Sequence, residues 1–554
     1  MTETEPRRMA PGRVAPPAAL LLALLLGALA AFWPGQTALP PSDRDEARFA
    51  QATKQMLESG DFADIRFQDA PRHKKPVGIY WLQAASAALA GGPEAPIAAY
   101  RVPSLVGAAL ATALTAWAVA PLIGWPAAAA AGAMLGLSAL LQVEARIAKT
   151  DAALLAVIAL AMGALARLML DPARRWMARL FWAATGVGVL IKGPIILIPA
   201  AGALGWRAVA ARSLAPFRGL RPIEGALIAA AIAAPWLIAI TLATDGAFWT
   251  EAVGEDMLAK VASGQESHGA PPGLYLAIVC GTFWPMAALA PVAALWLWPR
   301  IGAPWAGFLL GWLVPTWLLF ELVPTKLPHY VLPAYPALAA LIAAALLAPD
   351  APSAPGRWAR RALLILWAVP TAGLTLGAAA ALPVIESRVS WPALGLALAA
   401  APPLRLAGRA LWRWRLQAFA LRTGAGAALI YAAAFGFVLP GLETGFVSPR
   451  LADAAAAHRC GPGPVALAGY GEPSAVFLIG TDTLTGGGAE AARALAEGRA
   501  ALAFVDARER AAFDAALAEA GATATQAAAV EGFNYSKGRR VSLALMLPGG
   551  GCGG

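Results

Sequence analysis

Residues 101–170 read RVPSLVGAALATALTAWAVAPLIGWPAAAAAGAMLGLSALLQVEARIAKTDAALLAVIALAMGALARLML. No charged side chain occurs between Val102 and Val143. A helix needs about 20 apolar residues to cross roughly 30 Å of hydrocarbon. This stretch therefore predicts three membrane-spanning helices, at 101–120, 124–142 and 152–170.

The composition of the whole chain agrees with this pattern. Of its 554 residues, 59% are hydrophobic and only 14% are charged, and the mean hydropathy is +0.61. A typical soluble domain carries about 25% charged residues. This high fraction of hydrophobic residues and low fraction of charged residues excludes a disordered tail, a nucleic-acid-binding domain and an ordinary cytosolic enzyme. The net charge of +10 comes from arginines beside apolar runs, which is typical of membrane topology. The three cysteines have no metal-ligand spacing.

Apolar runs elsewhere predict further spans. They lie at 18–33, 224–243, 274–298, 303–323, 330–348, 362–383, 391–406 and 423–440. The stretch 180–206 is acceptable in length as one helix, but cytoplasmic loops collect Lys and Arg. The arginine-rich segments at 174–179 and 207–221 fall on one side only if 180–206 crosses twice, with Lys192 at the outer turn. We therefore expect about thirteen spans, with the N-terminus inside and the C-terminus outside.

The first 33 residues resemble a signal peptide, because arginines precede an apolar core. No small-residue cleavage site follows, since the run ends in Phe32, Trp33 and Pro34. We predict an uncleaved first span.

Two domains are expected, a transmembrane domain at 1–445 and an outer domain at 446–554. The second alternates short apolar runs with helical stretches at 488–497 and 507–520, which is typical of a small α/β domain. The apolar runs are Val465–Ala468, Ala475–Ile479, Ala501–Val505 and Val541–Met546. Cys460 and Cys552 bracket this domain and are expected either to pair in an oxidising compartment or to remain free thiols.

The first outer loop, 34–100, is long and polar and predicts two surface helices. Ser42 with Asp45 resembles a capping box. The helix that follows carries Phe49, Thr53, Met56 and Leu57 at helical spacing, so we expect it to lie on the membrane surface. A second amphipathic stretch covers 77–90.

Ionisable residues collect on the outer side, where they are functional candidates by default. Interfacial lysines can hold a lipid phosphate as a leaving group, and a facing carboxylate can deprotonate an acceptor. Simpler explanations stand beside this one. The acidic residues Asp45, Glu46 and Asp151 can be helix caps. The Arg72–Lys75 run can be a collar that binds lipid headgroups. Lys192 can be a side chain that snorkels to the membrane interface. His268 and His329 can be interface residues without a chemical role.

The ordered motifs resemble those of the bacterial lipid-linked-sugar glycosyltransferases of GT-C fold, the aminoarabinose (lipid A) transferase and protein O-mannosyltransferase-like group. The resemblance covers about residues 18–350. Its motifs are Asp45-Glu46-Ala47-Arg48-Phe49-Ala50, Lys75-Pro76 with Tyr80-Trp81, Lys149-Thr150-Asp151, Leu190-Ile191-Lys192-Gly193-Pro194, Phe248-Trp249, Lys260, His268-Gly269-Ala270-Pro271 and Thr325-Lys326-Leu327-Pro328-His329-Tyr330.

The resemblance implies roles for individual residues. Asp45 is the leading acceptor-activating carboxylate, and Asp151 with Glu46 completes the acidic set. The donor-binding set that holds the lipid phosphate is Lys75, Lys192, Lys260, His268, Lys326, His329 and Tyr330. Lys260 stands where the aminoarabinose transferases carry Arg, so it would contact phosphate as a point charge. Lys74 stands where they carry Glu, which puts a zinc site in doubt. We expect no required cofactor and no metal site; a divalent metal is compatible with the reaction but has no support in the sequence.

The leading hypothesis is an integral-membrane glycosyltransferase of the bacterial inner membrane, with its active site and C-terminal domain on the periplasmic side. It would move a sugar from undecaprenyl phosphate to lipid A, another envelope glycolipid or a protein, without a nucleic-acid partner. The alternative is a flippase or transporter of a lipid-linked sugar, but such proteins commonly show repeated halves with helices broken at the midplane. A third reading, an envelope scaffold, leaves the one-sided ionisable residues unexplained.

Overall fold

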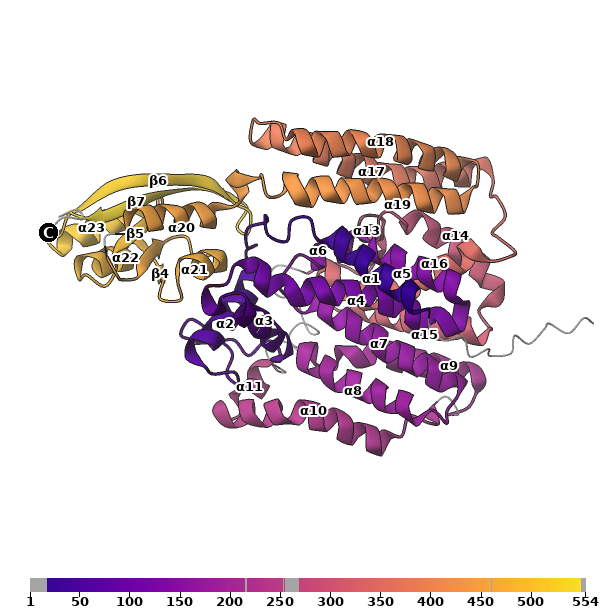
Figure 1. Cartoon of the computed structure of the whole chain (residues 1–554). Helices are drawn as coiled ribbons and strands as arrows, with labels where there is room; N and C mark the ends of the chain where they lie inside the picture. Colours follow the sequence, from indigo (N-terminus) through magenta and orange to yellow (C-terminus); the bar gives the residue numbers. More distant parts are fainter. Residues whose placement is uncertain (1–16, 215–216, 253, 255–268, 460, 550–554) are drawn as a thin grey trace, which may run out of the picture.

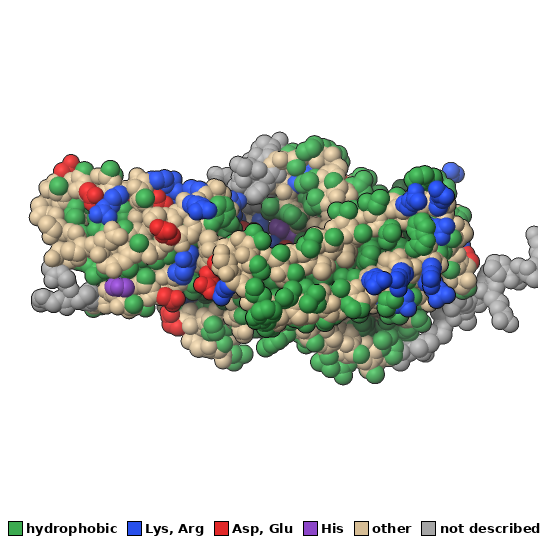
Figure 2. Space-filling view, turned by 90° about the horizontal axis from the view of Figure 1, so that it is seen from above, with side chains coloured by type: hydrophobic (Ala, Val, Ile, Leu, Met, Phe, Trp, Pro, Cys, Tyr) green, Lys and Arg blue, Asp and Glu red, His purple; other side chains and the backbone are tan. Residues whose placement is uncertain are grey.

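The computed structural model describes residues 17–549 except 215–216, 253, 255–268 and 460. A large body of helices carries a smaller C-terminal domain with a mixed β-sheet at one end (Figure 1). Figure 2 shows Lys and Arg side chains gathered at the end of the helical body farthest from that domain. This distribution matches the arginine-rich loops from which the sidedness was predicted.

The described residues contain eight helical segments long and apolar enough to cross a membrane. The prediction of a helical multi-span membrane protein is confirmed. The segments are α4 (Ile97–Ile123), α7 (Asp151–Leu170), α8 to α9 (Arg175–Ala211), α10 (Pro222–Ala243), α15 (Pro304–Leu322), η7 with α16 (Pro328–Leu347), α17 (Arg357–Ile385) and α19 with η8 (Leu416–Val438). The shorter apolar helix α1 (Ala18–Phe32) and the longer α18 (Trp391–Trp412) pack beside them.

The segment from Arg175 to Ala211 turns back on itself. Helix α8 (Arg175–Lys192) ends where Gly193 adopts φ +69°, and the short η2 (Gly193–Ile196) leads into α9 (Leu197–Ala211). The loops at the far ends of both helices meet, since a Cβ on Gly219 would lie 2.7 Å from the carbonyl oxygen of Pro172. The Trp182 indole also donates to the carbonyl oxygen of Leu220 at 2.7 Å. The chain therefore passes twice through this region, with Lys192 at the turn.

Two expected helices are interrupted. The predicted span 274–298 consists of α13 (Leu274–Thr282), η5 (Ala287–Leu289) and α14 (Ala290–Leu297), and a turn separates α13 from η5. Pro285 lies in that turn and has no backbone N–H to continue a helix. The predicted span 124–142 is divided into α5 (Trp125–Gly136) and α6 (Ala139–Glu144).

The first outer loop contains the two predicted helices, α2 (Asp45–Ser59) and α3 (Gly78–Leu89), with the small hairpin β1 (Arg66–Phe67) and β2 (Ala70–Pro71) between them. Two details of the prediction are wrong. Ser42 caps no helix, because its hydroxyl donates to Glu46 Oε2 at 2.8 Å and α2 has no side-chain cap. Most of α2 is buried between α3 and the C-terminal helix α21 (Pro473–Ile479), instead of lying open on a surface.

The C-terminal sheet has the strand order β4-β3-β5-β7-β6. Strands β4 (Leu484–Gly486), β3 (Val465–Ala468) and β5 (Leu502–Asp506) are parallel, whereas β7 (Arg539–Pro548) and β6 (Ala524–Asn534) are antiparallel to their neighbours. Alternate residues face opposite sides of a strand. One side packs on α20 (Val447–His458) and α21, and the other on α22 (Gly488–Ala496) and α23 (Arg510–Glu519). The apolar run Ala475–Ile479 is thus helical, not a strand.

Some sequence predictions fall outside the described part of the chain. Lys260 and His268 belong to an undescribed stretch, as do Cys460 and Cys552. The donor-binding role of the first pair and the pairing of the cysteines stay predictions.

Candidate functional site

A cavity of about 690 Å³ lies between the first outer loop and the outer ends of several spans. In Figure 2 a hollow on the upper face contains histidine, basic and acidic side chains. The predicted residues that line the cavity are Asp45, Glu46, Lys75, Asp151, Lys192, His329 and Tyr330. Segments separated by nearly three hundred residues of sequence therefore supply one set of ionisable groups.

Asp45 is the first residue of α2 and is partly exposed to the cavity. Within the described residues its carboxylate has no hydrogen bond or ion pair. The N-terminal end of a helix carries positive partial charge and stabilises a carboxylate there. Asp45 is thus a carboxylate available to a ligand in the cavity.

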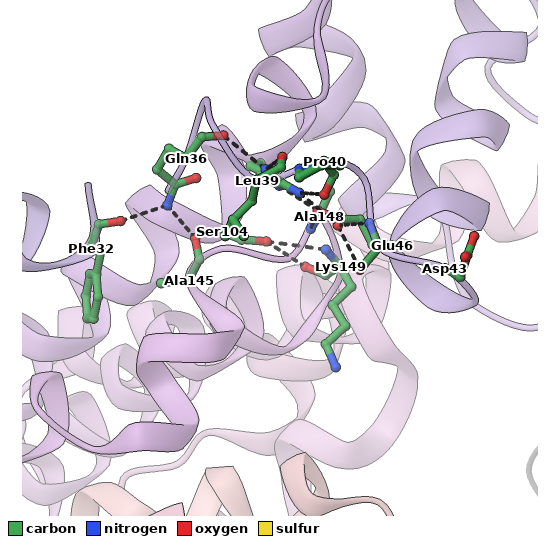
Figure 3. Close-up of polar contacts among 12 residues, drawn as sticks. Phe32, Gln36, Leu39, Pro40, Asp43, Glu46, Ser104, Ala145, Ala148 and Lys149 are labelled. Atoms are coloured by element: carbon green, nitrogen blue, oxygen red, sulfur yellow. Dashed lines mark hydrogen bonds and ion pairs between the residues drawn. The ribbon is translucent and has the colours of Figure 1, made fainter. Parts of the chain in front are cut away.

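Glu46 is held very differently from Asp45. Its side chain is 1% exposed and forms two bonds with Arg101, from Nε to Oε1 at 2.7 Å and from Nη2 to Oε2 at 3.0 Å. The backbone N–H of Ala148 also donates to Oε1 at 3.0 Å (Figure 3). Burial acts to raise the pKa of Glu46, but Arg101 and these hydrogen bonds outweigh it and hold the pKa below its ordinary value. Both oxygens are occupied, so this geometry anchors the start of α2.

Asp151 begins α7 and is the centre of a buried group of charges. Lys192 Nζ donates to Asp151 Oδ1 at 2.5 Å, and Lys149 Nζ lies 3.7 Å from Oδ2. Nε2 of His329 lies 3.9 Å from the same Oδ2. Two ammonium groups and an imidazole thus surround one carboxylate, which compensates its burial.

Lys149 connects this group to a second acid, Glu144. Its Nζ lies 3.0 Å from Glu144 Oε1 and 3.1 Å from His329 Nδ1. Figure 3 shows the Lys149 side chain extending away from Glu46. Burial opposes protonation of Lys149, yet the nearby carboxylates raise its pKa above the ordinary value. Burial raises the pKa of Glu144 despite the ion pair, so Glu144 holds a proton more readily than an exposed glutamate.

Tyr330 and the basic residues complete the cavity wall. The Tyr330 ring lies edge-on to the His329 ring, with centroids 5.1 Å apart, and Lys192 Nζ lies 5.6 Å from the Tyr330 centroid. Lys75 also lines the cavity, together with Arg48, Arg72 and Lys74. A ligand in this cavity therefore meets several cationic groups.

The structure does not bring every predicted residue to the cavity. Lys326 is 4% exposed and its Nζ donates to the carbonyl oxygen of Val323 at 2.6 Å. Its neighbours Thr325 and Leu327 line the cavity instead. Within the described residues, no group of three His, Cys, Asp or Glu could hold a metal ion.

One functional-site residue, Arg101, was not selected from the sequence. It is a buried charged residue at the end of an apolar run, where a charge is commonly a topological marker. Glu144 and Lys149 lie in the outer-side cluster of ionisable residues that contains Asp151, but the sequence assigned neither of them an individual role.

Comparison with solved structures identifies the architecture. The crystal structure of ArnT from Cupriavidus metallidurans bound to undecaprenyl phosphate matches 96% of this chain and 98% of its own, with a TM-score of 0.75 and 19% sequence identity. Its apo form matches with a TM-score of 0.73. The chain has an ArnT-like fold.

Sequence comparisons point to the same group of transferases as the structural comparison. The family model for dolichyl-phosphate-mannose-protein mannosyltransferase matches residues 74–238. An undecaprenyl phosphate-alpha-4-amino-4-deoxy-L-arabinose arabinosyl transferase of Pseudomonas fluorescens is 29% identical over 308 residues, and one of Enterobacter sp. is 28% identical over 309. Each alignment includes 54% of this chain and 54% of the relative, so it spans about half the length of either protein. The predicted resemblance is confirmed.

Proposed function

We propose that this protein is an integral-membrane glycosyltransferase that moves a sugar from a polyprenyl (undecaprenyl) phosphate donor to lipid A, another envelope glycolipid or a protein. The observation that carries the proposal is one cavity lined both by an available carboxylate, Asp45, and by cationic side chains that include Lys75 and Lys192. The solved relative of the same fold holds undecaprenyl phosphate, and the sequence relatives are named as undecaprenyl phosphate-dependent arabinosyl transferases.

In the proposed reaction Asp45 accepts the proton of an acceptor hydroxyl or amine. The acceptor atom forms a bond to the anomeric carbon of the sugar while the bond from that carbon to the lipid phosphate breaks. The phosphate oxygen leaves with the electron pair. Lys75 and Lys192 stabilise the negative charge that develops on it, together with Tyr330. Lys260 and His268 join this set in the sequence prediction.

The remaining acids have supporting roles in this scheme. Asp151 holds Lys192 and Lys149 in place through the contacts described above, and its charge is compensated by theirs. Glu46 fixes the first turn of α2 through Arg101. Both residues therefore position groups around the cavity, whereas Asp45 is the acid left available to the acceptor.

We place the protein in the bacterial inner membrane, with the cavity and the C-terminal domain on the periplasmic side. The basic loops at the opposite end of the helical body support this orientation. About thirteen crossings follow when α1, α18, the two passages of α8 and α9, and the interrupted helices are counted with the long segments. Membrane lipids would surround the body, and no nucleic-acid partner is proposed.

The proposed chemistry uses no nucleotide and no required metal. The carboxylate and lysine set can supply both the base and the charge stabilisation of the leaving phosphate.

The test is mass spectrometry of envelope lipids and glycoproteins from a deletion strain complemented with wild type, Asp45→Asn or the control Asp69→Asn. Asp69 is an exposed acid of the same loop. Loss of one sugar mass from a glycoconjugate in the deletion and Asp45→Asn strains, but not with the control, supports transfer. Unchanged acceptors with lipid-linked sugar trapped on the cytoplasmic leaflet would instead indicate a flippase.

A further inference from the structure

The turn between β6 and β7 of the C-terminal domain contacts the two residues that precede Asp45. The backbone N–H of Asp43 donates to the Tyr535 hydroxyl oxygen at 2.6 Å. The Arg44 guanidinium donates to the carbonyl oxygen of Ser536. From α21 of the same domain, the backbone N–H of Ser474 donates to Asp43 Oδ1 at 3.2 Å. Residues more than four hundred positions away in sequence thus hold the segment at 43–44.

The backbone at this segment needs such support. Arg44 has φ +67° and ψ −107°, a conformation that side chains with a Cβ rarely adopt. A strained residue of this kind persists only when its surroundings fix it. The next residue is Asp45, so the direction in which α2 starts depends on the Arg44 backbone.

The other side of Asp45 is fixed by the helical body. Glu46 bonds with Arg101 of α4 and with the backbone of Ala148, which precedes Lys149 and Asp151 (Figure 3). Asp45 is therefore flanked by one residue tied to the membrane-spanning helices and two tied to the C-terminal domain. Its position depends on both attachments.

The β6–β7 turn is itself rigidly supported. Asn534 is 3% exposed and its Nδ2 donates to Oε1 of Glu472, a residue that is 5% exposed, at 2.8 Å. The Tyr535 ring packs edge-on against Phe446, with centroids 6.3 Å apart. Ser474 of α21, the other partner of Asp43, itself donates to the Ser448 hydroxyl at 2.6 Å. The turn and α21 can thus impose a geometry on residues 43–44, because each is restrained by its own partners.

We propose that the β6–β7 turn, through Tyr535, is a positioning device for Asp45. It holds the strained 43–44 backbone so that the Asp45 carboxylate faces the cavity. The inference rests on the proposed function, in which Asp45 accepts a proton from the acceptor. It gives the C-terminal domain a part in the reaction although its turn supplies no group to the reacting atoms.

The test compares full-length wild type, Tyr535→Phe and the control Thr525→Val in detergent. Thr525 is exposed on β6 and makes no side-chain hydrogen bond to described residues, so its variant removes a hydroxyl without touching the turn. Tyr535→Phe removes the acceptor for the Asp43 N–H and keeps the ring. Because small displacements of a catalytic group can cost up to about 100-fold, we expect kcat to fall about 10-fold or more. The KM for undecaprenyl-phosphate-linked sugar should stay unchanged.

Hydrogen–deuterium exchange supplies a readout independent of turnover. Faster exchange confined to the amides of residues 42–48 in Tyr535→Phe, with the control like wild type, supports the proposal. Unchanged exchange and kcat overturn it, as does a general loss of protection with kcat and KM both altered, since that indicates a merely structural role. If Asp45→Asn is inactive while Tyr535→Phe is fully active, the proposed function stands and only the positioning role of the turn is overturned. A wild type without sugar transfer, and no different from Asp45→Asn, overturns the function and this role together.

Discussion

At the scale of single residues, the cavity separates carboxylates by their surroundings. Asp45 and Glu46 are neighbours in sequence, but only the second is sealed between a guanidinium and a backbone N–H. A buried carboxylate of that kind depends strongly on its partner, because removing one member of the pair leaves an uncompensated charge. The Arg101 side chain also donates to the carbonyl oxygens of Gln36, Leu39 and Pro40.

Arg101→Met should therefore destabilise the protein by about 3–5 kcal/mol, measured by thermal unfolding in detergent. The matched control is Arg66→Met, which removes an exposed ion pair to Asp64 and should cost about 0–1 kcal/mol. The double variant Arg101→Met with Glu46→Met should recover part of the loss. Equal unfolding temperatures for Arg101→Met and the control would show that the pair does not anchor α2.

Lys192 has a different partner and a different predicted effect. Its Nζ donates to Asp151 and also faces the cavity. Lys192→Met should weaken binding of undecaprenyl phosphate about tenfold or more, since hydrogen bonds to charged groups contribute about 1.5–3 kcal/mol. Binding would be followed by tryptophan fluorescence. Arg175→Met, at the far end of the same helix and exposed, should bind like wild type. An unchanged affinity of Lys192→Met for undecaprenyl phosphate would show that Lys192 does not contribute to donor binding.

At the scale of elements, helix contacts set the spacing of the cavity walls. Helix α3 starts at Gly78, shortly after Lys75, and lies against the end of α8, which terminates at Lys192. A Cβ on Gly78 would lie 2.8 Å from the carbonyl carbon and oxygen of Leu190. The close approach of these helices therefore requires a glycine, and it determines how far apart the two lysines lie.

Gly78→Ala should force α3 away from α8. Overpacking of this kind typically costs about 1–3 kcal/mol, so a lower unfolding temperature is expected, with a higher KM for the donor. Gly27→Ala in α1 provides the control, because a Cβ there meets nothing within 4 Å. That control should unfold at or slightly above the wild-type temperature, since Ala favours helix more than Gly. An unchanged KM in Gly78→Ala would show that donor binding does not depend on the distance between Lys75 and Lys192.

Elements also show what the sequence could predict. Apolar length was sufficient for the long helices, and the arginine pattern was sufficient for the turn at Lys192. The hydrophobic periodicity and the length of the apolar runs could not by themselves reveal the helix break at Pro285 or the helical conformation of Ala475–Ile479. The burial of α2 was equally inaccessible, because its cover comes from α21, more than four hundred residues away in sequence.

The candidate site was predictable to a similar extent. Motif resemblance selected Asp45, Lys75, Asp151 and Lys192, which line one cavity. It included Lys149 in a motif but could not assign a role to Lys149 or Glu144, because their roles depend on tertiary contacts: Lys149 reaches His329 on a distant segment. Nor could it show that Lys326 turns toward the backbone at Val323.

At the scale of the whole molecule, the helical body and the C-terminal domain meet at Asp43, and the ionisation of Asp43 predicts that this contact depends on pH. Burial and the neighbouring Glu472 raise the pKa of Asp43 to about 6, although Ser474 and Arg48 act in the opposite direction. An unfolded aspartate titrates near 3.9. Between these values the folded protein binds more protons than the unfolded chain, so stability falls as pH rises.

Docking of the C-terminal domain should therefore be tightest below about pH 4 and weaken as the pH rises through about 6. Hydrogen–deuterium exchange of residues 42–48, corrected for the intrinsic effect of pH, should show progressively less protection across that window. Asp43→Asn keeps an oxygen that can accept from Ser474 but cannot ionise, so its protection should be independent of pH there. An Asp43→Asn protein with the same pH dependence as wild type would assign the titration to another group. Because Asp43 lies two residues before Asp45, the same ionisation links the docking of the outer domain to the geometry of the proposed base.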